Sequence, residues 1–438
     1  MRWLLARLDQ HWFAPASLRD LAFARIVIVG AQLLFFLPSR AGQVALAHAD
    51  PILYQPLVAL KVLLLPLGGW GVRPSAMFLD GVWVAAVVSG VFGLLGFRTR
   101  AALLVFAVTN TILQTHDYSY SEFHHPQALM MLALWVLAVA PAGAAWSLDD
   151  LRQRARTAVS TGKFARPQPD EYLSPWARWP MRLIQWLFAL VYFSAGLEKV
   201  VIGGLDWYNG YTIAYYMLLD GLRGNLPVSI MLAQHPHLLV SVSIAAAVFE
   251  LGFAIAILVP VLAFPFVAFG SAFHTGIWFL QRAPFFQFLA LYSVFIEPIR
   301  EHWLRRLRVA PRQPRPRWTV IYDGMCPICL RTVTILGYLD LRERLVLANL
   351  EDPDAHLVVP PTITAADLHT QMHVVDPAGR AYTGFLAFRA LTRLLPPLWP
   401  IFPLVYLPGV TWLGARAYNH IAYSRARVPC RVASSTLA

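Results

Sequence analysis

Two cysteines three positions apart carry the most distinctive chemistry in this sequence. Cys326 and Cys329 frame the motif Cys-Pro-Ile-Cys, which follows an apolar run at 318–322 and an Asp-Gly pair at 323–324. A helix-like stretch continues at 330–339, so the segment reads as strand, turn, cysteine pair and helix. That order places the first thiol at a helix N-terminus, where backbone N–H groups and the helix dipole favour a thiolate.

The pair predicts a redox site. We expect Cys326 to attack a disulfide as a thiolate and Cys329 to resolve the resulting mixed disulfide, and we include Asp323 in the site. One alternative is a zinc site completed by Cys430 and His420, although their separation is not a usual zinc spacing; another is a vestigial pair. Three cysteines in the whole chain exclude a disulfide scaffold and are typical of a redox or metal site in a reducing compartment. We predict the redox site, with no bound metal.

Apolar residues dominate the composition. They make up 58% of the chain and charged residues only 14%, whereas soluble domains carry about 25% charged residues. Most of the chain is therefore expected in lipid, as a polytopic all-α membrane domain of about eight transmembrane helices. The apolar runs near spanning length lie at 20–38, 78–96, 101–114, 125–142, 180–199, 238–260, 261–281 and 284–299.

The net charge of +12 comes from basic residues that cluster beside these apolar runs. This is the pattern of cytoplasmic loops and not of a nucleic-acid-binding surface, so no nucleic-acid partner is expected. An even number of spans with a cytoplasmic N-terminus puts the basic segments 98–100, 152–178 and 300–317 in the cytoplasm. A further span at 51–66 would put them outside, so we predict an outer interfacial or re-entrant helix there. The sequence thus predicts an integral protein of the bacterial cytoplasmic membrane with a cytoplasmic C-terminal domain.

The character of the sequence changes after the membrane domain, which we assign to 1–299. An Arg/Pro-rich linker at 300–317 leads to an α/β domain at 318–438. The apolar segment 396–414 contains five prolines, so it is expected on the membrane surface or against the domain and not across the bilayer. Strands are expected at 318–322, 345–350, 372–375 and 381–383, and helices at 326–339 and 385–395.

The segment 318–430 resembles the DCC family of thiol–disulfide oxidoreductase-like proteins. The resemblance implies a thioredoxin-like fold and a thiol or disulfide protein as partner. One departure from thioredoxins is that no clear cis-proline loop, which positions their substrate, precedes the strand at 372–375. The matching residues are Tyr322-Asp323-Gly324, Cys326-Pro327, Cys329, Val374-Val375-Asp376, Gly379, Tyr382, Tyr418-Asn419, Ile421-Ala422, Arg425 and Cys430.

A second set of polar residues lies within the apolar runs. Only three of the 36 lysine and arginine residues are lysines, and Lys199 is one of them. A lysine, unlike an arginine, can lose its proton. Gln185, Tyr192, Gly196 and Lys199 are spaced 7, 4 and 3 residues apart, which puts them on one helix face. The small Gly196 allows another helix to approach closely.

Other ionisable residues fall in neighbouring runs. His124 and His125 open the fourth run, Glu250 lies near the middle of the sixth, and His274 lies in the outer half of the seventh. The predicted topology brings Lys199 and the three histidines toward the outer face. Structural alternatives are a lysine that extends to the membrane surface, polar side chains that hydrogen-bond between helices, and an interfacial histidine.

The region 15–299 resembles the HTTM domain, a family that includes the vitamin K-dependent gamma-carboxylase. The resemblance implies that Lys199 is a base that deprotonates a hydroquinone, assisted by His125, and that a quinone or lipid is the ligand. Apolar neighbours such as Phe193 and Leu197 would favour the neutral amine. The chain departs from the carboxylase in having Glu198 before the lysine and no large lumenal domain, so protein carboxylation is not expected. The matching residues are Tyr192-Phe193, Ala195-Gly196, Lys199, Trp207, Gly210, His124-His125, Trp146-Ser147, Asp149, Glu250 and Phe273-His274.

Three functions follow from these observations. The first is a membrane-tethered thiol–disulfide oxidoreductase, which a solvent-accessible Cys326 would favour. The second is a carboxylase-like membrane enzyme that acts on a quinone or lipid, which a pocket around Lys199 would favour. The third is a non-catalytic membrane scaffold. We predict the first, and no cofactor is certain from the sequence.

Overall fold

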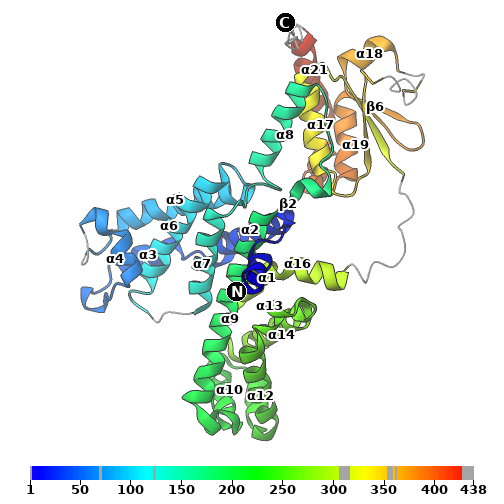
Figure 1. The fold of residues 1–438 in the computed structure, drawn as a ribbon. Coiled ribbons are helices and arrows are strands. Elements are labelled where there is room, and N and C mark those ends of the chain that lie inside the picture. Colours follow the sequence, from blue (N-terminus) through cyan, green and yellow to red (C-terminus); the bar gives the residue numbers. More distant parts are fainter. Residues whose placement is uncertain are drawn as a thin grey trace. The chain divides into compact units, whose positions relative to one another are not determined.

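The computed structural model describes residues 2–68, 72–121, 125–304, 316–352, 359–360 and 363–426. The chain divides into two compact units (Figure 1). Unit 1 comprises Met1–Asp149 and Pro169–Val309, and unit 2 comprises Asp150–Gln168 and Ala310–Ala438. The predicted boundary at 299 assigned all earlier residues to the membrane domain, whereas here the segment 150–168 groups with the C-terminal domain.

Unit 1 is helical and contains three to five candidate membrane spans. Three of the predicted runs form single long apolar helices, and two others form helix pairs with a bend. The single spans are α5 (Ala76–Leu95), α9 (Arg178–Val201) with its preceding turn, and α14 (Ala263–Gln281) with its preceding turn. The bent pairs are α2 (Leu18–Ala31) and its extension with α3 (Arg40–Ala47), at 58°, and α11 (Pro227–Ala233) with α12 (Pro236–Gly252), at 98°.

The remaining predicted spans are shorter or more polar. The runs at 101–114 and 125–142 form α6 (Thr99–Asp117) and α7 (His125–Val139). The run at 284–299 is divided into α15 (Phe286–Leu291), a 3-10 turn and α16 (Ile296–Ile299). The count of eight spans therefore stays a prediction. The run at 51–66 folds into short pieces that include α4 (Val58–Leu63).

Buried polar pairs explain why α6 is less apolar than a simple span. Asn110 accepts a hydrogen bond from Gln32 at 2.8 Å, and His116 lies 2.8 Å from the amide oxygen of Gln43. All four side chains are buried. Because lipid offers such groups no partner, α6 must turn this face toward α2 and α3.

Unit 2 contains a mixed four-stranded sheet with the order β4-β3-β5-β6. The sheet is consistent with a thioredoxin-like fold, and α17 (Pro327–Leu339) connects the parallel strands β3 and β4. Strands β5 and β6 are antiparallel to their neighbours, and α19 (Gly384–Leu394) follows β6. The strands are β3 (Trp318–Tyr322), β4 (Leu345–Asn349), β5 (His373–Val375) and β6 (Ala381–Thr383). All lie within one residue of their predicted bounds; the short helix α18 (Ala365–Thr370) was not predicted.

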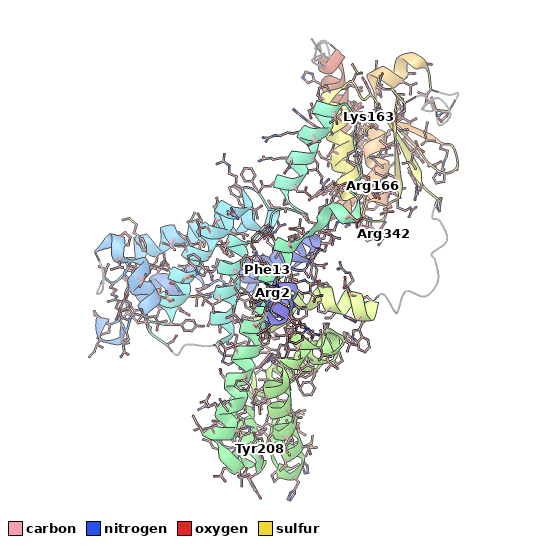
Figure 2. All side chains as sticks on the ribbon, viewed as in Figure 1. Arg2, Phe13, Lys163, Arg166, Tyr208 and Arg342 are labelled. Carbon is pink, nitrogen blue, oxygen red and sulfur yellow. The ribbon has the colours of Figure 1, made fainter. Side chains whose placement is uncertain are left out.

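The segment after α7 contributes to unit 2. Most of α8 (Leu148–Thr161) belongs to this unit, and Ala158 is buried in its core. A side chain at Gly337 would lie 2.5 Å from the ring of Phe164, so α17 needs glycine there. Arg166, labelled in Figure 2, donates to Asp340 at 2.9 Å and to the Leu345 carbonyl at 3.0 Å. The 150–168 segment and the C-terminal domain thus form one packed unit.

The proline-containing segment 396–414 forms no long helix. It consists of a 3-10 turn at Pro396–Leu398, the short helix α20 (Phe402–Val405) and the start of α21 (Val410–Ala426). Prolines at the first turns of the first two pieces prevent either piece from extending back into the residues before it.

Candidate functional site

Cys326 is the N-cap residue of α17. Its backbone is extended (φ −95°, ψ 114°), and Pro327 begins the helix, where no N–H is needed. The Leu330 N–H donates to the Cys326 carbonyl at 3.0 Å. Burial raises the pKa of Tyr322, at the end of β3, so its hydroxyl stays neutral near the cysteine pair. The first thiol is therefore attached where the helix dipole favours a thiolate.

Asp323 shapes the turn between β3 and Cys326. Its side chain accepts a hydrogen bond from the Met325 N–H at 2.8 Å, and its carbonyl accepts one from the Cys326 N–H at 3.3 Å. A side chain at Gly324 would lie 2.3 Å from the amide oxygen of Asn349, so β4 closes over the turn. Asp323 thus holds the loop that presents the first cysteine, and a direct chemical role for it stays a prediction.

Both thiols are covered. Cys326 is 1% exposed and Cys329 is 5% exposed. The structure therefore does not show the solvent-accessible Cys326 that would favour the oxidoreductase hypothesis. Cys329 borders a small cavity of about 40 Å³ together with Met372 and Tyr418. Tyr418, from α21, accepts a hydrogen bond from the Met372 N–H at 2.9 Å. The sequence contained Tyr418 within a family motif but gave no sign that it lies beside the second cysteine.

The zinc alternative finds no support in the part of the chain that the structure describes. No three His, Cys, Asp or Glu side chains gather there in a way that could hold a metal ion. Cys430 lies outside the described residues.

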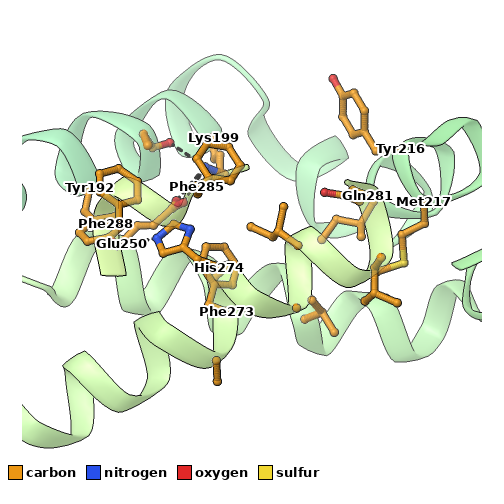
Figure 3. Close-up of a pocket in the computed structure, with 18 of the residues that line it drawn as sticks. Tyr192, Lys199, Tyr216, Met217, Glu250, Phe273, His274, Gln281, Phe285 and Phe288 are labelled. Atoms are coloured by element: carbon orange, nitrogen blue, oxygen red, sulfur yellow. Dashed lines mark hydrogen bonds and ion pairs between the residues drawn. The ribbon is translucent and has the colours of Figure 1, made fainter. Parts of the chain in front are cut away.

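Unit 1 holds a cavity of about 410 Å³ among α9, α10 (Tyr211–Gly224), α12 and α14 (Figure 3). Its lining is mostly apolar. Tyr192, Lys199, Glu250 and His274 lie together at one end, which we call the polar end, and Tyr216 and Gln281 lie toward the other. Five predicted residues line it together: His125, Tyr192, Lys199, Glu250 and His274. His124 lies outside the described residues.

Lys199 is joined to Glu250 by an ion pair. The amine lies 2.8 Å from one carboxylate oxygen, and it also donates to the Ala195 carbonyl at 3.3 Å. The ring of Trp207 lies 5.3 Å from the amine. Phe193 and Leu197, expected to surround the amine, are instead 45% and 43% exposed and do not line the cavity.

The close approach of α9 and α12 makes this pair geometrically feasible. A side chain at Gly196 would lie 2.9 Å from Leu251 and 3.1 Å from Glu250, so the small residue allows the approach that the sequence predicted. Glu198 is exposed and does not line the cavity. Gln185 does not line the cavity. Its side-chain amide donates to the Val294 carbonyl at 2.7 Å.

A second polar group lies next to the ion pair. The Tyr192 hydroxyl is 2.6 Å from His274 Nε2 and 2.6 Å from the Tyr292 hydroxyl. A side chain at Gly270 would collide with Tyr292, so α14 needs glycine there. Sequence reasoning missed Tyr292, although a hydroxyl within the run 284–299 was a signal that could have found it. His125 contacts Phe285, with ring centres 5.5 Å apart.

Comparison with protein families gives two matches. The HTTM domain matches residues 65–299, more than half of the chain, and the DCC1-like thiol-disulfide oxidoreductase matches residues 320–431. The second match covers the cysteine pair and nearly coincides with the predicted 318–430, whereas the first begins later than the predicted 15. No curated protein and no solved structure matches the chain.

We predict that the ion pair stabilises unit 1 as a pair. Lys199→Met should lower the free energy of unfolding by about 3 kcal/mol, because it leaves the Glu250 carboxylate buried without its partner. Lys199→Met combined with Glu250→Gln should recover most of that loss. Unfolding of the full chain in mixed micelles measures both. Glu198→Gln, an exposed change one residue away, is the control; a double variant as unstable as Lys199→Met would contradict this prediction.

Proposed function

We propose that this chain, which belongs to the HTTM domain family and carries a DCC1-like thiol-disulfide oxidoreductase domain, is a membrane-tethered thiol–disulfide oxidoreductase. The observation that carries the proposal is the position of Cys326 at the start of α17, three residues before Cys329. A helix N-terminus is the usual setting of a reactive thiolate in dithiol enzymes. The family match to the same segment supports redox chemistry there.

The proposed reaction transfers two electrons from the cysteine pair to a partner disulfide. The Cys326 thiolate attacks one sulfur of that disulfide, a mixed disulfide forms, and the other partner sulfur leaves as a thiolate. Cys329 then attacks the Cys326 sulfur, which releases the second partner thiol and leaves the pair oxidised. Because both cysteines are buried, the partner must displace covering chain before attack, and Tyr418 on α21 is part of that cover.

We further propose the predicted orientation, with about eight spans and with the N-terminus and unit 2 in the cytoplasm of a bacterial cell. Two observations support it. The basic segments all fall on one side in this arrangement, and 150–168 packs with the C-terminal domain, so that loop and the domain share a compartment. A reducing cytoplasm suits a dithiol that donates electrons.

A second candidate function is favoured by the cavity in unit 1. Its apolar lining suits the ring or chain of a quinone or lipid, and its polar end offers Lys199 with Glu250 and Tyr192 with His274. In this carboxylase-like function Lys199 would remove a proton from the bound molecule. To do so the amine must first pass its own proton along the 2.8 Å contact to Glu250. In such an enzyme the cysteine pair would have only an accessory role, outside the reaction at Lys199.

The redox proposal predicts an asymmetry between the two cysteines. Cys329→Ser should accumulate mixed disulfides with partner proteins through Cys326, because the resolving thiol is absent. Cys326→Ser should accumulate none. Mass spectrometry of acid-quenched membranes, with and without reductant, would measure these adducts. Cys430→Ser serves as the control and should behave as the unmodified protein; equal trapping by both single variants would refute the assigned roles.

The topology is tested by reporter fusions. Reporters inserted after Gly162 and after Arg317 should both give the cytoplasmic signal, and one inserted after Asn225 should give the external signal. The physical reason is the retention of arginine-rich loops in the cytoplasm. An external signal after Arg317 would overturn the proposed orientation.

The second candidate predicts that Lys199→Arg folds normally but is inactive, because an arginine keeps the charge and cannot act as a base. The measurement is oxygen-dependent consumption of a reduced naphthoquinone by the full chain in nanodiscs. Lys163→Arg makes the same chemical change at an exposed site and should have no effect. Consumption by Lys199→Arg at the rate of the unmodified protein would remove Lys199 from the reaction.

A further inference from the structure

Unit 2 contains a second, larger cavity of about 460 Å³ that shares no lining residue with the cavity beside Cys329. Four of the side chains that line it are arginines, and its lining contains no carboxylate among the residues that the structure describes. Trp318 and Tyr382, stacked with ring centres 5.7 Å apart, form part of its wall. The four arginines are Arg344, Arg380, Arg389 and Arg393.

These arginines are held by aromatic rings and backbone more than by acidic partners. The guanidinium of Arg393 lies 4.2 Å from the centre of the Tyr406 ring, and that of Arg389 lies 4.7 Å from it. Arg389 also donates to the Thr411 hydroxyl at 2.6 Å. Among the described residues, only Arg380 of the four has a carboxylate partner, Asp376 at 2.7 Å. Three of the four arginines therefore have no carboxylate partner among the described residues, and the cavity carries excess positive charge.

The same part of the unit exposes large apolar side chains. Tyr406 belongs to the segment 396–414, in which Leu404 is 58% exposed and Trp412 is 61% exposed. Arg342 lies over the ring of Trp399, with its guanidinium 5.4 Å from the ring centre. Six large apolar residues of the segment are exposed, and we call this set the apolar rim: Trp399, Ile401, Leu404, Leu407, Trp412 and Leu413.

We propose that the arginine cavity binds the phosphate of anionic lipid headgroups while the apolar rim inserts into the membrane interface. Arginine matches phosphate oxygens with paired N–H donors. Tryptophan and leucine beside basic residues are typical of segments that lie in the interface of a bilayer. A soluble phosphate compound would account for the arginines but leave the apolar rim in water. The lipid surface satisfies both features, and the chain is already anchored in a bilayer by unit 1.

The test compares the full chain in nanodiscs of phosphatidylcholine alone with nanodiscs that also contain phosphatidylglycerol. Hydrogen exchange of peptides from 399–413 is the readout. Phosphatidylglycerol should slow this exchange by about tenfold or more, as expected when several arginines lie near an anionic surface. High salt should weaken the effect because it screens the charges.

Variants and a soluble anion identify the cause. The double change Arg389→Gln and Arg393→Gln should remove the dependence on phosphatidylglycerol, and Arg389→Lys with Arg393→Lys should keep most of it. Arg331→Gln, an exposed change outside the cavity, is the matched control. Equal exchange in the two kinds of nanodisc would overturn the proposal. So would equal protection by inorganic phosphate in phosphatidylcholine nanodiscs, which would indicate a site for a soluble anion.

Discussion

Charged and polar groups inside the membrane helices must find their partners within the protein, because hydrocarbon offers none. The ion pair of Lys199 and Glu250 is the clearest consequence of this constraint, and both side chains line the cavity of unit 1. Gly196 lets α9 approach α12, which brings the amine to the carboxylate. The same constraint groups Tyr192 with His274 and Tyr292. The polar end of the cavity is therefore both a structural necessity and a place where proton transfer is feasible.

The cysteine pair is subject to two opposing effects. The start of α17 favours a thiolate at Cys326, whereas burial in apolar surroundings works against the charged form. Under the proposed function, a covered dithiol exchanges with a partner only after the cover moves. In this structure part of the cover is α21, which follows directly on the segment that contains the apolar rim.

The success of the sequence predictions depended on how local the determining contacts are. The strand, turn and helix around Cys326 are coded by consecutive residues, and their bounds were predicted to within one residue. The membrane-site residues stood out as polar side chains in apolar runs, but their pairing could not be predicted, because Lys199 and Glu250 are far apart in the sequence. Tyr292 was missed for the same reason.

Long-range packing also limited the prediction of domains and spans. The segment 150–168 reads as a basic loop, and its place in unit 2 depends on long-range contacts such as Ala158 in the core and Arg166 with Asp340. The bends at α2–α3 and α11–α12 lie beside Pro38 and Pro236, but their angles of 58° and 98° are not visible in the hydropathy of a single run.

The proposed function requires that Cys326 and Cys329 form a working redox pair in a membrane-anchored chain. A redox titration of the full chain in nanodiscs, with the two thiols quantified by alkylation and mass spectrometry, measures this. We expect one two-electron transition with a midpoint in the range of dithiol oxidoreductases, roughly −270 to −120 mV. A pair that stays reduced across this range, or that is reduced only below about −300 mV as structural disulfides are, would contradict it.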